Sequence, residues 1–85
     1  MSFKLSIVSP GGKILEDTVR SIAVPGIEGA FEVYSQHMPL IAGLKAGKAR
    51  VRKGDHMTVY EITGGILEVT PQHDVILLAD QVTAV

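Results

Sequence analysis

Apolar and polar residues alternate along most of this chain, with a period of two residues rather than the 3.6 of a helix. Near the N-terminus, Phe3, Leu5 and Ile7 alternate with polar residues, which is the pattern of a strand with one buried face. The same alternation recurs at 31–33, 48–52 and 57–60. No stretch of twelve or more residues carries apolar residues at helical spacing. The pattern therefore predicts a protein built from strands.

Turn-forming residues separate these apolar runs at intervals of about 8 to 12 residues, which is typical of an all-β sandwich or barrel. The breaks are at Pro10-Gly11-Gly12, Pro25-Gly26, Gly29, Gly47, Gly54-Asp55, Gly64-Gly65 and Pro71. The stretch 51–59 predicts a hairpin, because Gly54 can adopt the positive φ that its loop needs. The run VILLA at 75–79 is apolar on both faces. This predicts a strand inside a sheet rather than at its edge.

Length and composition limit the kinds of protein that this chain can be. With 85 residues, we expect one domain, 1–85, whose folding buries about 60–65% of the unfolded surface. The absence of cysteine excludes a disulfide framework and a thiolate metal site, and fits a reducing compartment. The net charge of −1 gives no overall attraction for nucleic acid or anionic lipid. No apolar run is long enough for a signal peptide or a membrane span, so we expect no direct membrane insertion.

Two local patterns could be taken for ligand sites. The segment GLKAGKA, 43–49, resembles a phosphate-binding loop, but it has one residue too few between its glycines and an alanine at the position of the metal-binding hydroxyl. His37, His56 and His73 match no ligand spacing, and no cysteine is present to complete a zinc site. We therefore predict no cofactor-binding and no metal-binding residues.

A catalytic set can also be imagined from a serine, a histidine and an acid. Ser35 and His37, with Asp74 or Asp80, could act as nucleophile, base and orienting acid. No strained nucleophile turn of the G-x-S-x-G kind accompanies them. We predict no catalytic residues, although a small hydrolase stays open as a third hypothesis.

A basic stripe lies within nine residues in the middle of the chain. Its members are Lys45, Lys48, Arg50, Arg52 and Lys53. Three of them share one face of the strand predicted at 48–52. A nucleic-acid-binding barrel would need stacking aromatic residues on the same surface, and the few aromatic residues do not interleave with the stripe. A solvated sheet face is one interpretation of the stripe, and a protein-partner surface is the other.

The sharpest local feature is the turn PGIEGAFEV at 25–33, where two glycines bracket Ile27 and Glu28. The segment HMPLIAGL at 37–44 is also unusually apolar for one that contains a proline and a glycine. A loop tip that exposes Ile27 beside a second apolar loop would be a contact surface. The residues alone leave open whether Ile27 is exposed or folds back onto the core.

Three segments in this order resemble the epsilon subunit of the F-type ATP synthase: VPGIEGAFEV, HMPLIAGLKAGKARV and GGILEVTPQHDVILLAD. The resemblance covers nearly the whole chain, from about Leu5 to Asp80. It implies the family's N-terminal domain, an all-β fold in the form of a flattened β-sandwich of two antiparallel sheets, with about ten short strands. That domain is a non-catalytic part of the central stalk, or rotor.

The resemblance also implies partners and a location. One face of the domain would dock on the gamma subunit and one end on the c-subunit ring, coupling proton- or sodium-driven rotation to ATP synthesis on the cytoplasmic side of the inner (plasma) membrane, as a peripheral component. The residues matching the ring-facing end are Gly26, Ile27, Glu28, Gly29, Ala30 and His37. The gamma-facing residues that the architecture implies are Leu40, Ile41, Leu44, Leu77 and Asp80. Because gamma normally covers one sheet face, we expect weak self-association of the isolated chain.

The sequence departs from the family pattern at three places. Ala30 stands where many relatives carry an acid, and Ser35-Gln36 where many carry Pro-Gly, so individual ring contacts can differ. Typical members continue into a helical hairpin that in some of them inhibits hydrolysis or binds ATP. Nothing here matches that hairpin, and we expect both functions to be absent from this chain. The alternative hypothesis is a stand-alone β-barrel binding module for nucleic acid or a small ligand.

Overall fold

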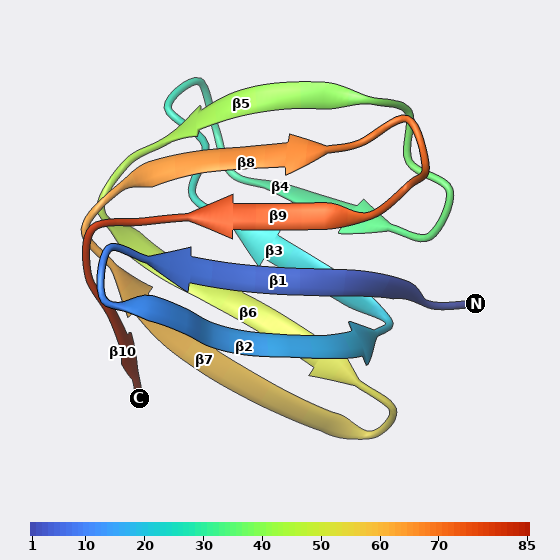
Figure 1. Cartoon of the computed structure of the whole chain (residues 1–85), viewed down its shortest axis with the longest axis horizontal. Helices are drawn as coiled ribbons and strands as arrows, with labels where there is room; N and C mark the ends of the chain where they lie inside the picture. The colour runs from blue at the N-terminus through green and yellow to red at the C-terminus, as the bar shows by residue number, and fades with distance from the viewer.

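The computed structural model describes all residues, 1–85, and consists of ten strands joined by turns and short loops. None of its elements is a helix long and apolar enough to span a bilayer. In chain order the strands are β1 (Phe3–Ser9), β2 (Gly12–Val19), β3 (Ser21–Val24), β4 (Phe31–Tyr34), β5 (Leu40–Leu44), β6 (Gly47–Lys53), β7 (His56–Ile62), β8 (Gly65–Val69), β9 (Val75–Leu78) and β10 (Val82–Ala84). Figure 1 shows them in two layers.

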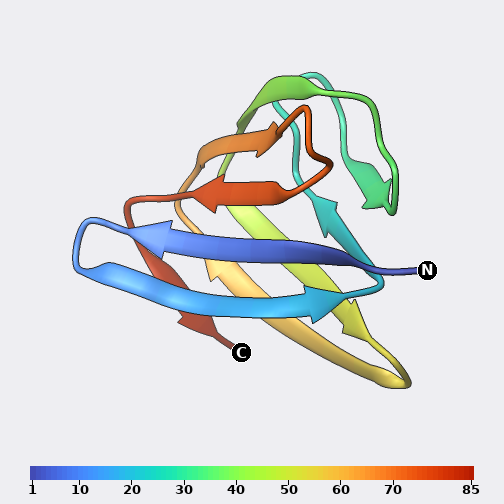
Figure 2. The ribbon, with the colours of Figure 1, turned by 45° about the vertical axis from the view of Figure 1, so that its right-hand side comes forward.

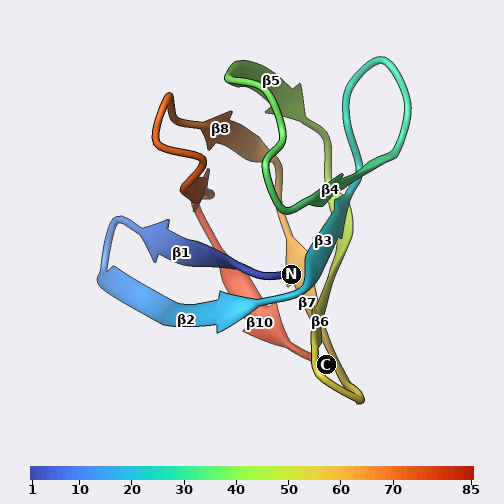
Figure 3. The ribbon, with the colours of Figure 1, turned by 90° about the vertical axis from the view of Figure 1, so that its right-hand side faces the viewer.

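The strands form two five-stranded sheets, as expected for a β-sandwich. The first sheet has the order β2-β1-β9-β8-β5, and the second has the order β10-β7-β6-β3-β4. Figures 2 and 3 show the two sheets facing each other. Both sheets are open, with two edge strands each, so the fold is a sandwich and not a barrel. One pairing differs from the prediction of antiparallel sheets, because β1 and β9 run parallel.

Alternation produces the core between the sheets. On β1, Phe3, Leu5 and Ile7 point inward and are buried, because successive side chains of a strand point to opposite faces. The run at 75–79 contributes Val75 and Leu77 from β9, which lies in the middle of the first sheet, as predicted. The core cluster comprises Phe3, Leu5, Ile7, Val19, Ile22, Val24, Val33, Leu44, Ala49, Val51, Ile62, Leu67, Val69, Val75, Leu77 and Ala79.

Strands β6 and β7 form the predicted hairpin around Gly54, which has a φ of 58°. In β7 it is Tyr60, opposite the buried Ala49, that packs against the core. Met57 points to the outer face of the second sheet and is exposed. The alternation of β7 therefore predicted the strand, while the identity of its inner face came from its pairing with β6.

The edge strands β4 and β5 lie on the same side of the molecule, where the chain passes from the second sheet to the first. The turn after β3 joins the sheets there, through a bridge between Gly26 and Leu44 and a hydrogen bond from the Lys45 N–H to the Pro25 carbonyl oxygen (2.9 Å). In Figure 1 this side is at the top, with β5 along it. We call it the β4–β5 side, meaning residues 25–44.

Candidate functional site: two interaction surfaces

The turn at Gly26–Ala30 projects from the β4–β5 side on a tightly packed base. A Cβ on Gly26 would lie 2.5 Å from the Gly29 carbonyl oxygen and 2.9 Å from the Phe31 ring, so the turn closes only with glycine there. The Ile27 N–H donates to the Gly43 carbonyl oxygen (2.9 Å), and the Ile27 side chain rests on Gly43. Ile27 nevertheless stays 64% exposed. The structure thus answers the open question: Ile27 lies on the surface and not in the core.

The loop containing His37 lies at the other end of β5. His37 Nδ1 hydrogen bonds with the Met38 carbonyl oxygen (2.8 Å), and His73 Nδ1 with the His37 carbonyl oxygen (3.0 Å). Met38, at the tip, is 71% exposed. Since Gly26 pairs with the end of β5 and His37 precedes its start, the two predicted ring-facing segments do not form one cluster. They lie at the two ends of β5, which spans about 14 Å at the rise of a strand.

The outer face of the first sheet carries a group of apolar side chains that we call the apolar face. Its members are Val8, Ile41, Ile66, Ile76 and Leu78. The strand register aligns Val8 with Leu78 and Leu78 with Ile66, and it places Ile76 in the neighbouring row. The side chains of Ile41, Ile66 and Leu78 are all exposed. These apolar side chains lie on four strands, from Val8 on β1 to Ile41 on β5, and Glu68 lies between Ile41 and Ile76 on the same face.

Two of the residues predicted to face gamma are corrected by the structure. Leu44 and Leu77 are buried in the core, because on β5 and β9 they belong to the inward-pointing set. Leu40 is half-buried and packs against the core. Ile41 and Asp80 do lie on the surface. The next residue of the same strand, Leu78, is the exposed one, and the sequence did not single it out.

The predicted basic stripe lies on the outer face of the second sheet, which we call the basic face. Lys48, Arg50 and Arg52 share this side of β6. Lys48 is directly opposite Glu61. On β4, at the edge of the same sheet, the Tyr34 hydroxyl donates a hydrogen bond to Glu32 Oε1 (2.8 Å). That hydrogen bond raises the pKa of Tyr34. Acids thus interleave with the bases, and the aromatic hydroxyl on this face is already engaged.

The residues considered for chemistry are not assembled into a site. The Nδ1 atom of His37 is hydrogen-bonded to the Met38 carbonyl oxygen rather than to Ser35. No hydrogen bond joins Ser35 to Asp74 or Asp80. His56 begins β7 in the second sheet, away from the contact between His37 and His73. No group of three histidine or acidic side chains gathers to hold a metal.

The phosphate-loop-like segment 43–49 also has the wrong surroundings for its ligand. It spans the end of β5 and the start of β6, so it connects two strands. A phosphate loop presents its backbone N–H groups at the start of a helix. This segment is followed by strand β6 and not by a helix.

The chain is thus a β-sandwich of two five-stranded sheets, with exposed apolar side chains on one outer face and projecting loops on one side. Residues 2–85 match the family described as the ATP synthase delta/epsilon chain, β-sandwich domain. The chain belongs to this family.

Curated relatives agree with this membership, and a solved structure shares the fold. The ATP synthase epsilon chain of Magnetococcus marinus is 40% identical over 77 residues, which are 91% of this chain and 56% of the relative. That of Chlorobium limicola is 36% identical over 93% of this chain and 91% of its own length. The same fold occurs in a chain of the Euglena gracilis mitochondrial ATP synthase, with a TM-score of 0.92 and 22% identity over 98% of this chain and 53% of that one. This chain therefore spans little more than half of several relatives and nearly all of others.

Proposed function

We propose that this chain is a non-catalytic subunit of the rotor of an F-type ATP synthase. It docks on the gamma subunit and on the ring of c subunits, and it couples ion-driven rotation to ATP synthesis from the cytoplasmic side of the membrane. The proposal rests on the apolar face. This face is exposed in a chain that belongs to the delta/epsilon family, and it lies next to the projecting loops of the β4–β5 side.

The apolar face is the surface that we assign to gamma. Ile41, Ile66 and Leu78 are exposed on adjacent strands, although burying them is not required for the sandwich to fold. Contiguous exposed apolar surface rimmed by polar residues is typical of protein–protein interfaces. The rim is present here, because Lys4 pairs with Glu16 over β1 and β2. A subunit that covers the apolar part would leave this ion pair in water.

The β4–β5 side is the surface that we assign to the ring. Ile27 and Met38 project at its two ends, and Glu28 provides an acid at the tip of the turn. Two separated contacts resist rotation of one body on another better than a single contact does. Glu28 is also suited to the polar loops of a neighbouring subunit.

A rotor component needs stiffness more than reactive groups. Two sheets held by 41 backbone hydrogen bonds within their strands surround a core of 16 buried residues. Close-packed interiors have low compressibility and transmit strain. A load applied at the β4–β5 side can therefore be transmitted through the body of the domain to the apolar face.

A binding titration of the chain against the gamma subunit of the same ATP synthase tests the proposal. Ile66→Glu should weaken binding by about 10–100-fold, because it places a charge in the centre of the apolar face. The matched control is Met57→Glu on the basic face, since Ile66 and Met57 are 45% and 46% exposed. The control should stay within about twofold of the wild type.

The ring contact is tested by repeating the titration with gamma bound to the c ring. Ile27→Glu should weaken binding to that complex and leave binding to gamma alone unchanged. Absence of binding between the folded wild-type chain and gamma would contradict the proposed function. Equal losses from Ile66→Glu and Met57→Glu would contradict the assignment of the surface.

A further inference from the structure

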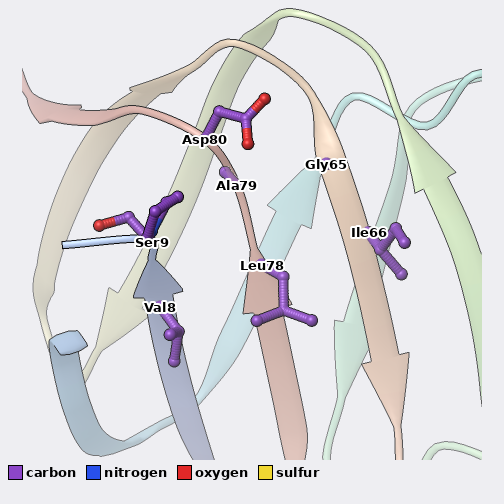
Figure 4. Close-up of a pocket in the computed structure, with 8 residues that line it drawn as sticks. Val8, Ser9, Gly65, Ile66, Leu78, Ala79 and Asp80 are labelled. Carbon is purple, nitrogen blue, oxygen red and sulfur yellow. The ribbon is translucent and has the colours of Figure 1, made fainter. Parts of the chain in front are cut away.

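The apolar face contains an open hollow where β1 and β9 end and β8 begins. It has a volume of about 390 Å³, and its lining includes Val8, Ile66, Leu78 and Asp80. Figure 4 shows the side chains of Val8, Leu78 and Ile66 on three successive strands, with Asp80 beyond the end of β9. The hollow is thus apolar along the sheet and acidic at its rim.

The shape of the hollow is set by backbone rather than by mobile side chains. Gly65 has a φ of 147°, and a Cβ at this position would collide with the Leu78 carbonyl oxygen. Only glycine therefore lets β8 approach β9 here. Beyond the strand ends, the Ala79 N–H donates to the Val8 carbonyl oxygen (3.1 Å). The hollow is consequently preformed, and a partner need not order it on binding.

Asp80 is the charged residue of the hollow, and it has no ion partner within the chain. The three ion pairs of the structure are Lys4–Glu16, Lys13–Glu16 and Lys53–Asp17. The Ser9 hydroxyl, at the same rim, donates to the Gly12 carbonyl oxygen. No lysine, arginine or histidine lines the hollow. Asp80 is exposed, so a basic side chain from another molecule could reach it.

We propose that the hollow receives one lysine or arginine side chain of the gamma subunit, with its hydrocarbon stem on Ile66 and Leu78 and its charged end at Asp80. Such side chains bury their stems along apolar surface while the charged end keeps a polar partner. A wholly apolar occupant would leave Asp80 desolvated and unpaired, which is unfavourable. The inference rests on the proposed function, because gamma is the partner named there.

Charge-neutral replacement of Asp80 separates this pairing from general apolar contact. In titrations of the full chain against gamma, Asp80→Asn should weaken binding about tenfold. It should also make the affinity less dependent on salt, since one attractive pair is lost. Asp80→Glu should restore most of the affinity. The control is Asp55→Asn at the β6–β7 turn, which also removes an exposed, unpaired acid and should change neither affinity nor salt dependence.

The outcomes distinguish failure of this inference from failure of the proposed function. If the wild type binds gamma and Asp80→Asn binds equally well, the pairing is wrong and the rotor assignment stands. If the wild type does not bind gamma, both are wrong. If Asp80→Asn abolishes dimers of the chain in sedimentation but leaves gamma binding intact, the occupant is a basic residue of a second copy, which also overturns the inference.

Discussion

The two outer faces of the sandwich share one core but differ in composition. On the first sheet, Ile66 and Leu78 are exposed in an apolar row, whereas on the second sheet Lys48, Arg50 and Arg52 alternate with the buried residues of β6. The fold requires only that the inner faces be apolar. The basic face is explained by contact with water. Contact with water does not explain the apolar face, so of the two faces it is the apolar one that indicates a partner.

The largest contrast lies between neighbouring residues of β9, one on each side of the first sheet. Leu77→Ala should lower the free energy of unfolding by about 2–5 kcal/mol, because it leaves a cavity in the core. Leu78→Ala should lower it by less than about 1 kcal/mol but weaken binding to gamma. Urea unfolding measures the first quantity and titration the second.

Leu77→Val provides a milder test if Leu77→Ala does not fold. It should lose less stability and bind gamma as the wild type does, since its side chain points inward. The separation of the two faces of β9 would be refuted if Leu78→Ala destabilised the chain as much as Leu77→Ala.

Much of the fold could be predicted from local pattern. The alternation at Phe3–Ile7 gave the right strand and the right inner face, and Gly54 marked the hairpin. The two apolar faces of 75–79 correctly indicated a strand inside a sheet. These features depend on neighbours in sequence, so the sequence displays them directly.

What could not be predicted depends on pairing between distant segments. The parallel pairing of β1 with β9 follows from the course of the whole chain. It also decides which residues lie side by side on the apolar face. Leu77 rather than Leu78 was chosen as a surface residue because both faces of this strand are apolar. Only its pairing with other strands decides which face points to the core. The hollow beside Gly65 likewise requires three strand ends to meet.

A smaller effect is expected from contact between copies of the isolated chain. The exposed apolar face should give weak dimers, with a dissociation constant of about 0.1–1 mM, because a small apolar contact stabilises association only modestly. Sedimentation equilibrium at high concentration measures it. Ile41→Glu, on the apolar face, should abolish the dimer, and Met57→Glu, on the basic face, should not. Dimers that persist in Ile41→Glu would mean that another surface mediates them.

The smallest effect concerns the polar part of the first sheet, over β1 and β2. Glu16 accepts from Lys13 Nζ (2.6 Å) and pairs with Lys4 Nζ (2.9 Å). These contacts lower the pKa of Glu16 from 4.5 to about 2, and the hydrogen bond from Lys13 is the largest cause. A carboxyl group with a lowered folded-state pKa stabilises the fold above its unfolded pKa, and that stabilisation is lost as the pH falls through the folded value. The loss should therefore occur between about pH 4.5 and 2.

Glu16→Gln tests this with thermal melts across the acid range. At pH 7 it should melt slightly below the wild type, by a few degrees at most, since exposed ion pairs stabilise weakly. The difference should disappear near pH 2 and shrink in high salt. Binding to gamma should be unchanged, because the ion pair lies at the rim of the apolar face. If Glu16→Gln weakened binding as strongly as Ile66→Glu, the interface would extend over β1 and β2, and the contrast between apolar centre and polar rim would be wrong.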